Sequence, residues 1–333
     1  MKKLFVAFFA LAALAACAKE EIVSLDKGEA IQFGNAFVEN ATRAADKSYS
    51  GDKALTAFNL YGTVTGTNGT INIYNGCTVT GEVGYKVDAN GDVTEDPNVW
   101  TCPVNQYWIA GATYAFAAVA DGTVATTDTN GMPLTLTCNT AVDANNVQKD
   151  LLYAEATATG KASGNGKVNF SFSHLLSKAQ FTVKSNTQGD YYYSVKNINV
   201  NNFVNGTYYI KAVDEIAAGT WVGTGEKANT AFGNINDVRA TDANGKTCEF
   251  QRLLIPTTAA FTVSCTIELW NANGDAADVK LATENKTFTV NQDLVAGHAY
   301  DFNLSLSVGE LIEFTVTEKP TWNPTTGGTG VTL

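Results

Sequence analysis

Eight Asn-Gly dipeptides spread along 333 residues limit what this chain can fold into more than any other feature. Asn-Gly favours the two-residue type I′ turn of a β-hairpin, because both positions tolerate a positive φ. The stretches between the dipeptides are rich in Thr, Val, Tyr and Phe and contain few apolar stripes of helical period. We therefore predict an all-β fold, with enough length for two ordinary domains. The dipeptides begin at Asn68, Asn75, Asn90, Asn130, Asn165, Asn205, Asn244 and Asn273.

A stretch near the N-terminus, IQFGNAFVENATRA, predicts a strand followed by a cleavage site. Ile31, Phe33 and Phe37 fall on one face of an extended strand because side chains alternate with period 2, and Asn35 interrupts that face. Arg43 follows in small, polar surroundings that a trypsin-like protease can enter. Removing such a strand would leave an open groove, which another strand would have to fill.

The first residues have the pattern of an export signal. Residues 1–3 are Met-Lys-Lys, and residues 4–16 form an apolar run that is too short to span a bilayer stably. The run closes with Leu-Ala-Ala-Cys, which resembles the bacterial lipobox and implies a lipid on Cys17 and cleavage before it. An ordinary secretory peptide with an incidental cysteine is the alternative. Residues 18–21, AKEE, look like a signal for the outer face of the outer membrane, where we expect the lipid to anchor the precursor.

The formal charge of −11 argues against a nucleic-acid partner, whose affinity would depend on Lys and Arg releasing counterions. Basic and acidic residues up to position 43 cancel, so residues 44–333 carry the whole charge. That charge keeps an exposed protein soluble. The cancelling residues are Lys2, Lys3, Lys19, Lys27 and Arg43 against Glu20, Glu21, Asp26, Glu29 and Glu39.

Five cysteines remain besides Cys17, and an odd number cannot all pair within one chain. Two of them, Cys248 and Cys265, flank an expected hairpin near Pro256 and Thr257, so they could lie opposite each other. Buried free thiols are the equal alternative, because free Cys behaves as a small hydrophobe. No C-x-x-C spacing occurs, which disfavours zinc. The five are Cys77, Cys102, Cys138, Cys248 and Cys265.

One segment resembles a calcium loop, because Asp88, Asn90 and Asp92 alternate. It lacks the glycine at position six and the glutamate at position twelve of such loops, so we expect a solvated hairpin tip and no metal site.

Catalytic motifs are missing from the sequence. Only two histidines occur, and no H-E-x-x-H, G-x-S-x-G, Walker lysine loop or post-strand G-x-G-x-x-G appears. His298 with Asp301 and some serine is the one candidate for a triad. His174 reads as a strand histidine satisfied by a neighbour. We expect neither an enzyme nor a cofactor.

Two longer motifs carry a resemblance. Residues 170–183, FSFSHLLSKAQFTV, contain F-x-H-x-x-x-K-x-x-F-x-V, and residues 296–306, AGHAYDFNLSL, contain A-G-H-x-Y-x-F-x-L-x-L. DLLYA (150–154) and Trp322 near the C-terminus fit the same set of motifs. The pattern of DLLYA by itself fits either a short helix or a strand. Together these runs resemble the fimbrillin family, the subunits of type V pili.

The resemblance implies two tandem transthyretin-like β-sandwich domains and assembly with other pilus subunits by strand exchange. It further implies cleavage between Arg43 and Ala44. The expected parts are a signal peptide (1–16), a propeptide (17–43), an N-terminal domain (44–186) and a C-terminal domain (187–333) with a donor tail (311–333). The polar run NTQGD after residue 185 reads as the linker.

The expected donor is interrupted. Ile312, Phe314 and Val316 alternate as a strand should, but two prolines follow and lack the N–H that a ladder needs. We therefore expect a first strand, a break, and a short second piece around Val331 and Leu333.

Two functions follow from these expectations. The first is a structural pilus subunit at the outer membrane and cell surface, contributing to adhesion. The alternative is a tip or accessory adhesin, or a glycan-binding surface lipoprotein that does not polymerise. Aromatic residues such as Trp108, Tyr114 and Phe116 could form a sugar platform, although core packing is the usual role of aromatics in strands.

Overall fold

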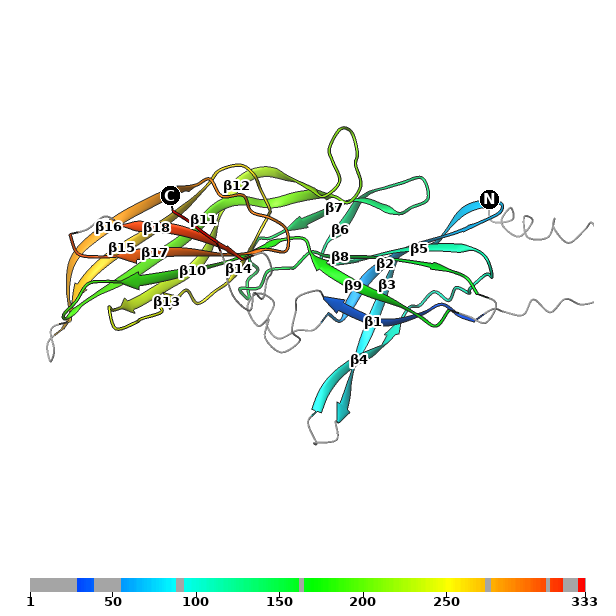
Figure 1. Cartoon of the computed structure of the whole chain (residues 1–333), viewed down its shortest axis with the longest axis horizontal. Helices are drawn as coiled ribbons and strands as arrows, with labels where there is room; N and C mark the ends of the chain where they lie inside the picture. The colour runs from blue at the N-terminus through cyan, green and yellow to red at the C-terminus, as the bar shows by residue number, and fades with distance from the viewer. Residues whose placement is uncertain are drawn as a thin grey trace, which may run out of the picture.

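The computed structural model describes residues 29–38, 55–87, 93–161, 165–272, 277–309, 312–319 and 329–332, and its side chains except those of 35–38, 82–87, 93–99 and 329–332. Within these ranges the regular elements are strands, β1 to β19 (Figure 1). The predicted all-β fold is confirmed. None of the described residues belongs to a helix long and apolar enough to cross a membrane.

The N-terminal strands form a sheet that closes on itself as a barrel, in the order β1-β4-β3-β2-β5-β8-β9. The closure depends on β1, which joins the two ends of the sheet. The bounds are β1 Gln32–Val38, β2 Ala57–Gly66, β3 Gly69–Val87, β4 Val93–Thr101, β5 Thr113–Ala120, β8 Leu152–Thr159 and β9 Lys167–His174.

Alternation along these strands builds an aromatic barrel core. In β9 every second residue is buried, from Val168 to His174. Trp108, Tyr114 and Phe116 are 5%, 1% and 1% exposed, so the prediction of core packing is confirmed for them. Because aromatic side chains are large, they fill the barrel with few residues.

The DLLYA segment is a strand from Leu152 onward, which settles the choice between helix and strand. Just before it, Asp150 is buried and its Oδ2 lies 2.6 Å from His174 Nδ1. The histidine is therefore satisfied by a neighbour, as predicted.

The remaining strands form two facing sheets, ordered β13-β10-β17-β18-β19 and β16-β15-β11-β7-β6, with β14 paired to β10 and β12 paired to β11. Phe181, Phe302 and Phe314 from the first sheet pack with Val200 and Phe261 from the second. The bounds are β6 Thr123–Thr127, β7 Pro133–Asn139, β10 Ser177–Ser185, β11 Tyr191–Tyr209, β12 Thr220–Val238, β13 Lys246–Thr247, β14 Arg252–Leu254, β15 Phe261–Asn271, β16 Val279–Val290, β17 Ala299–Leu306, β18 Glu313–Lys319 and β19 Thr329–Thr332.

Strand pairing does not follow the expected division at residue 186. β10 precedes that residue yet pairs in parallel with β17, and β7 pairs with β11. A third core, which includes Leu136, Leu176 and Ile255, joins the barrel to the sandwich. The expected linker connects β10 and β11, which lie in the two sheets of the sandwich. The division into two domains at this residue stays a prediction.

A hairpin forms at Asn68, where β2 turns into β3, but its two-residue loop is Thr67-Asn68 and Gly69 already pairs with Gly66, so the dipeptide does not form the predicted type I′ turn. The Asn-Gly signal was wrong at Asn75, because β3 continues through this dipeptide. Leu60 pairs with Cys77 and Tyr61 with Asn75, so Gly76 is left over as a bulge with a φ of 72°. The same left-handed backbone that suits a hairpin turn also suits a bulge, so the dipeptide alone does not separate them.

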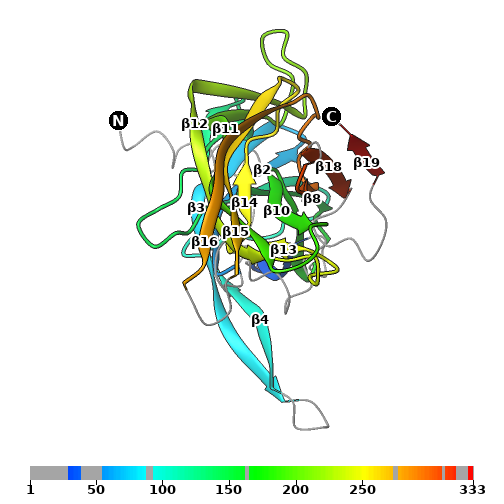
Figure 2. The same ribbon diagram turned by 90° about the vertical axis from the view of Figure 1, so that its left-hand side faces the viewer.

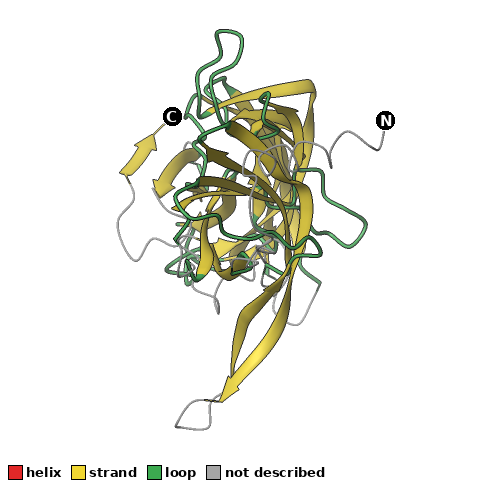
Figure 3. Cartoon of the chain, turned by 90° about the vertical axis from the view of Figure 1, so that its right-hand side faces the viewer, coloured by secondary structure: helices red, strands yellow, loops and turns green. Residues whose placement is uncertain are grey.

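A long hairpin arm projects from the barrel (Figures 2 and 3). It is built by β3 and β4, which pair as far as Val87 and Val93. The calcium-like residues of its tip lie outside the described residues.

The expected hairpin between Cys248 and Cys265 is wrong. β14 pairs with β10, whereas β15 pairs with β11 and β16, so the chain crosses from one sheet to the other. The Cys248 thiol donates to the Phe250 carbonyl at 2.9 Å, and Cys265 lies in register with Lys286. Both are buried free thiols.

Candidate functional site

The candidate site is the position of β1 in the barrel wall. On one side β1 is antiparallel to β4, with Phe33 in register with Trp100. On its other side β1 is parallel to β9, from Gln32 beside Lys167 to Val38 beside Phe172. β4 and β9 are the neighbours that β1 joins in the closed order, so its removal would open the barrel there.

The residues before β1 continue this pairing against residues 106–108. Ile31 N–H donates to the Gln106 carbonyl at 2.8 Å, and Trp108 N–H donates to the Glu29 carbonyl at 3.0 Å. The backbone from 29 to 33 therefore lies along residues 100–108, which we call the β4 flank.

Phe33 anchors the strand in the barrel core. Its side chain is 3% exposed, and its ring lies 5.8 Å from Tyr74, 6.4 Å from Phe116 and 6.2 Å from Phe170, centroid to centroid. Ile31 is also buried, at 7%. Burying side chains of this size stabilises the folded chain by roughly 1.5–3 kcal/mol each.

Gly34 leaves room beside β1 for side chains of β9, a feature that the sequence patterns did not predict. A Cβ at this position would lie 2.1 Å from Asn169 Oδ1 and 3.0 Å from Lys167 Cβ. A lone glycine inside a strand pattern is a known sign of close backbone approach, so this signal was present.

The pairing of β1 with β9 shifts register between Phe33 and Ala36. Ala36 is the partner of Phe170, and Phe37 is the partner of Ser171. The simple alternation expected from Phe33 to Phe37 therefore does not run through the strand. The side chain of Phe37 lies outside those described, as do Cys17, Arg43 and Ala44.

The expected donor segment lies in the sandwich. β18 pairs with β17 along its whole length and with β19 on its other side. Phe314 is 3% exposed and stacks on Phe288 at 4.5 Å, while Val316 is 1% exposed and Ile312 is half-buried. The backbone of Val331 in β19 is in register with Val316. The side chain of Val331 and the whole of Leu333 lie outside the described part of the chain.

The triad candidate is wrong. His298 Nδ1 lies 2.7 Å from Glu318 Oε1, and Asp301 forms an ion pair with Lys319 instead. His298 directly precedes β17 and Asp301 lies within it, and each has its partner in β18. Among the described residues, no group of three metal-ligating side chains occurs.

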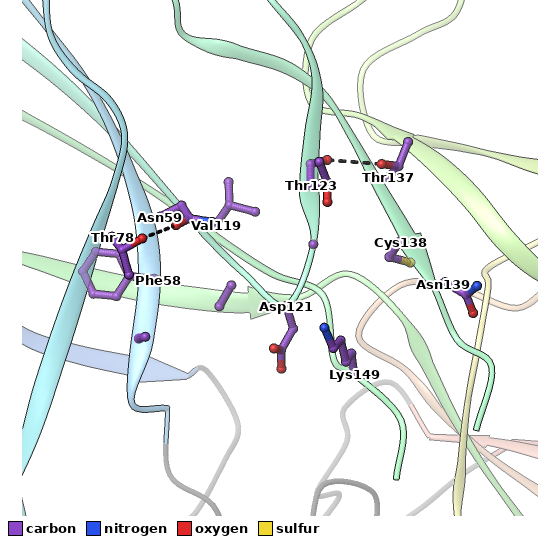
Figure 4. A pocket seen from close by; sticks show the side chains of 13 residues that line it. Phe58, Asn59, Thr78, Val119, Asp121, Thr123, Thr137, Cys138, Asn139 and Lys149 are labelled. Carbon is purple, nitrogen blue, oxygen red and sulfur yellow. Dashed lines mark hydrogen bonds between the residues drawn. The ribbon is translucent and has the colours of Figure 1, made fainter. Parts of the chain in front are cut away.

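A hollow of about 420 Å³ lies where β2, β5 and β7 come together (Figure 4). Its lining includes the charged residues Asp121 and Lys149 and the smaller side chains of Asn59, Thr78 and Cys138. Burial and the nearby Asp150 raise the pKa of Asp121. Two hydrogen bonds join residues of the lining: Thr78 donates to Asn59 Oδ1 at 3.1 Å, and Thr137 Oγ1 donates to the Thr123 carbonyl at 3.4 Å.

This geometry defines a class of all-β proteins in which an N-terminal strand closes a barrel beside a β-sandwich. The model of the fimbrillin-like family matches residues 42–320. The chain therefore belongs to the fimbrillin-like family, as its motifs suggested. No curated protein matches it.

Solved structures are similar in fold. A fimbrial protein from Bacteroides vulgatus is 15% identical with a TM-score of 0.62, over 89% of this chain and 100% of that one. A fimbrial assembly protein from Parabacteroides distasonis is 14% identical with a TM-score of 0.42, over 86% of this chain and 96% of that one. Of the two, only the first has a TM-score above 0.5, and at 15% identity its likeness supports the fold alone.

Proposed function

We propose that this chain is a structural subunit of a cell-surface pilus that loses β1 and accepts a strand from another subunit in its place. The observation that carries the proposal is that β1 alone joins β4 to β9 in the closed order of the barrel. The fimbrillin-like family supports a pilus or adhesion subunit at the cell surface, and it is a family of structural proteins.

The energetics favour replacement over an empty groove. Without β1, the apolar neighbours of Phe33 would meet water, and the backbone groups of β9 and the β4 flank would lose their partners. A buried backbone group left unpaired costs about 1–3 kcal/mol. A strand from a second subunit would restore both the ladder and the apolar contacts.

Maturation would proceed in two steps. The precursor is exported as a lipoprotein with its lipid on Cys17 in the outer membrane, and an arginine-specific protease then cuts between Arg43 and Ala44. Because β1 precedes the cut, cleavage makes it a separate peptide that can leave with the lipid. The subunit would then be held by its neighbours in the fibre.

The donor would come from β18 and β19. β19 is the edge strand of its sheet, so it can leave with little disturbance. β18 is different, since Phe314 and Val316 fill the sandwich core. Donation of β18 would require this core to open, and insertion of its apolar residues into the next groove would recover the loss.

The burial of β18 also favours a second candidate. A tip or accessory adhesin would accept a strand, or remain lipid-anchored, without donating one. In that case β18 would stay in its own sandwich, where Phe314 stacks on Phe288. The protein would then function by binding a receptor or glycan on a host or bacterial surface.

The test is arginine-specific proteolysis of the purified precursor, followed by electrophoresis without boiling. We expect a ladder of oligomers, and N-terminal sequencing should show a new end at Ala44. Arg43→Ala and deletion of residues 311–333 should each abolish the ladder. Arg239→Ala, at a half-exposed arginine in the sandwich, is the matched control and should leave it unchanged. A monomer under all conditions would refute polymerisation and leave the adhesin as the remaining candidate function.

A further inference from the structure

Two thiols face each other at the base of the hairpin arm. Cys77 lies in β3, Cys102 directly follows β4, and their sulfur atoms are 2.9 Å apart. Nonbonded carbons pack best at ~3.5–4.0 Å, and sulfur is larger, so two thiols are crowded at this distance. Both side chains are half-buried against the barrel core. We infer that Cys77 and Cys102 form a disulfide in the exported protein, and that this bond holds the β4 flank to β3 when β1 is absent.

The place of Cys102 supports this role, which rests on the proposed loss of β1. The β4 flank contacts β1 and the residues before it on both sides of Cys102, through Trp100 and through Gln106. Once β1 has left, these contacts are gone until a new strand arrives. A covalent link from Cys102 to β3 would keep the flank in place during that interval.

Tyr74 connects the thiol pair to the groove. It is buried, its ring lies 5.8 Å from that of Phe33, and it belongs to the same hydrophobic cluster as Cys77 and Cys102. Burial, with Cys102 and Cys77 adding to it, raises the pKa of Tyr74. Tyr74 and Cys77 lie three residues apart in β3, so the thiol pair and the contact surface of Phe33 belong to one segment of the barrel core.

Formation of the bond requires an oxidant, which we take to be a disulfide of an oxidase or of a small molecule in the exported compartment. One thiolate of the pair attacks this disulfide, releases one thiol and forms a mixed disulfide. The second cysteine then displaces the other half of the oxidant. Two electrons and two protons thus pass from Cys77 and Cys102 to the two released thiols. Burial raises the pKa of Cys102 to about 12, so exchange should become faster as pH rises.

The bond itself is tested on full-length protein exported by a Gram-negative host, denatured in iodoacetamide and digested with trypsin without reduction. Cleavage at lysines places Cys77 in peptide 54–86, and Cys102 together with Cys138 in peptide 87–149. We expect these peptides to be linked, and to remain linked in Cys138→Ser, which assigns the bond to Cys102. Cys102→Ser should release Cys77 for alkylation. Complete alkylation of Cys77 and Cys102, in the exported protein and after incubation with oxidised glutathione, would overturn the inference.

The role of the bond is tested by hydrogen exchange of the β4 flank after cleavage at Arg43. In Cys102→Ser we expect exchange to be about tenfold faster than in the wild type, because local opening is no longer restrained. The uncleaved precursor and Cys138→Ser should show no such difference, and equal rates in all cleaved forms would overturn the role. If cleavage never occurs while the peptides are linked, the proposed function fails and the bond stands. If ladders form while both thiols stay reduced, only this inference fails.

Discussion

Gly34 of β1 lies so close to Asn169 of β9 that a Cβ at residue 34 would come to 2.1 Å from the Asn169 side-chain oxygen. The Asn169 side chain therefore occupies the space that a side chain at residue 34 would need, and Lys167 Cβ lies 3.0 Å from the same point. Residue 34 also falls at the register shift between Phe33 and Ala36. A residue without a side chain at position 34 therefore suits the way β9 side chains pack over β1.

Gly34→Ala should destabilise the precursor by at most about 1 kcal/mol, because the added methyl group displaces the exposed Asn169 side chain and crowds Lys167 Cβ at 3.0 Å, while alanine recovers part of the backbone entropy that glycine loses on folding. Urea unfolding of the uncleaved chain measures the effect. Gly66→Ala is the matched control, since a Cβ there would meet nothing within 4 Å. Equal midpoints for the two variants would show that the space beside residue 34 is not crowded.

Phe33→Ala should cost about 3–5 kcal/mol, since it removes a buried ring that contacts three other aromatic rings. If the variant also lets β1 detach locally, the amide of Trp108 should exchange faster than in the wild type, because this amide donates to the Glu29 carbonyl beside β1. Hydrogen exchange and urea unfolding together measure both effects. Gln32→Ala, at an exposed neighbour in the same strand, should change little; an unchanged Phe33→Ala protein would refute the anchor.

Glu268 should make the sandwich sensitive to acid. Hydrogen bonding from Lys196 at 2.7 Å, with Lys280 at 3.2 Å, lowers the pKa of its carboxyl group. Because the folded pKa lies below the unfolded value of ~4.3, the stabilisation is complete above that value and is lost as pH falls through the lowered pKa.

Thermal unfolding between about pH 6 and pH 3 measures this dependence. The wild type should lose ~0.2–1 kcal/mol more stability over that range than Glu268→Gln, a small effect because both lysines are partly solvated. Glu284→Gln, at an exposed glutamate on the neighbouring strand, should follow the wild type. Parallel curves for wild type and Glu268→Gln would contradict the prediction.

Gln148→Leu should destabilise the junction between barrel and sandwich. The buried amide donates to the carbonyls of Thr140 at 2.5 Å and Leu253 at 2.9 Å, and it accepts from Leu253 N–H at 2.8 Å. Each backbone group left unpaired costs about 1–3 kcal/mol. Urea unfolding should show a loss of several kcal/mol, whereas Lys149→Ala, at the exposed next residue, should be nearly neutral. A neutral Gln148→Leu would mean that other groups or water satisfy these atoms.

The sequence by itself determined the strand content, the apolar face of β9, the aromatic core and the family, because these depend on local alternation and on motifs within one segment. It also indicated a strand at residues 31–38, with Phe33 as a buried residue.

Only the tertiary structure decided which strands meet. The closure of the barrel by β1, the parallel pairing of β10 with β17, and the approach of Cys77 to Cys102 all join segments that are distant in the chain. The register shift after Phe33 and the bulge at Gly76 also arise from the partner strand. Alternation within a strand shows which side chains share a face. The partner of each strand and its register depend instead on the packing of the whole sheet.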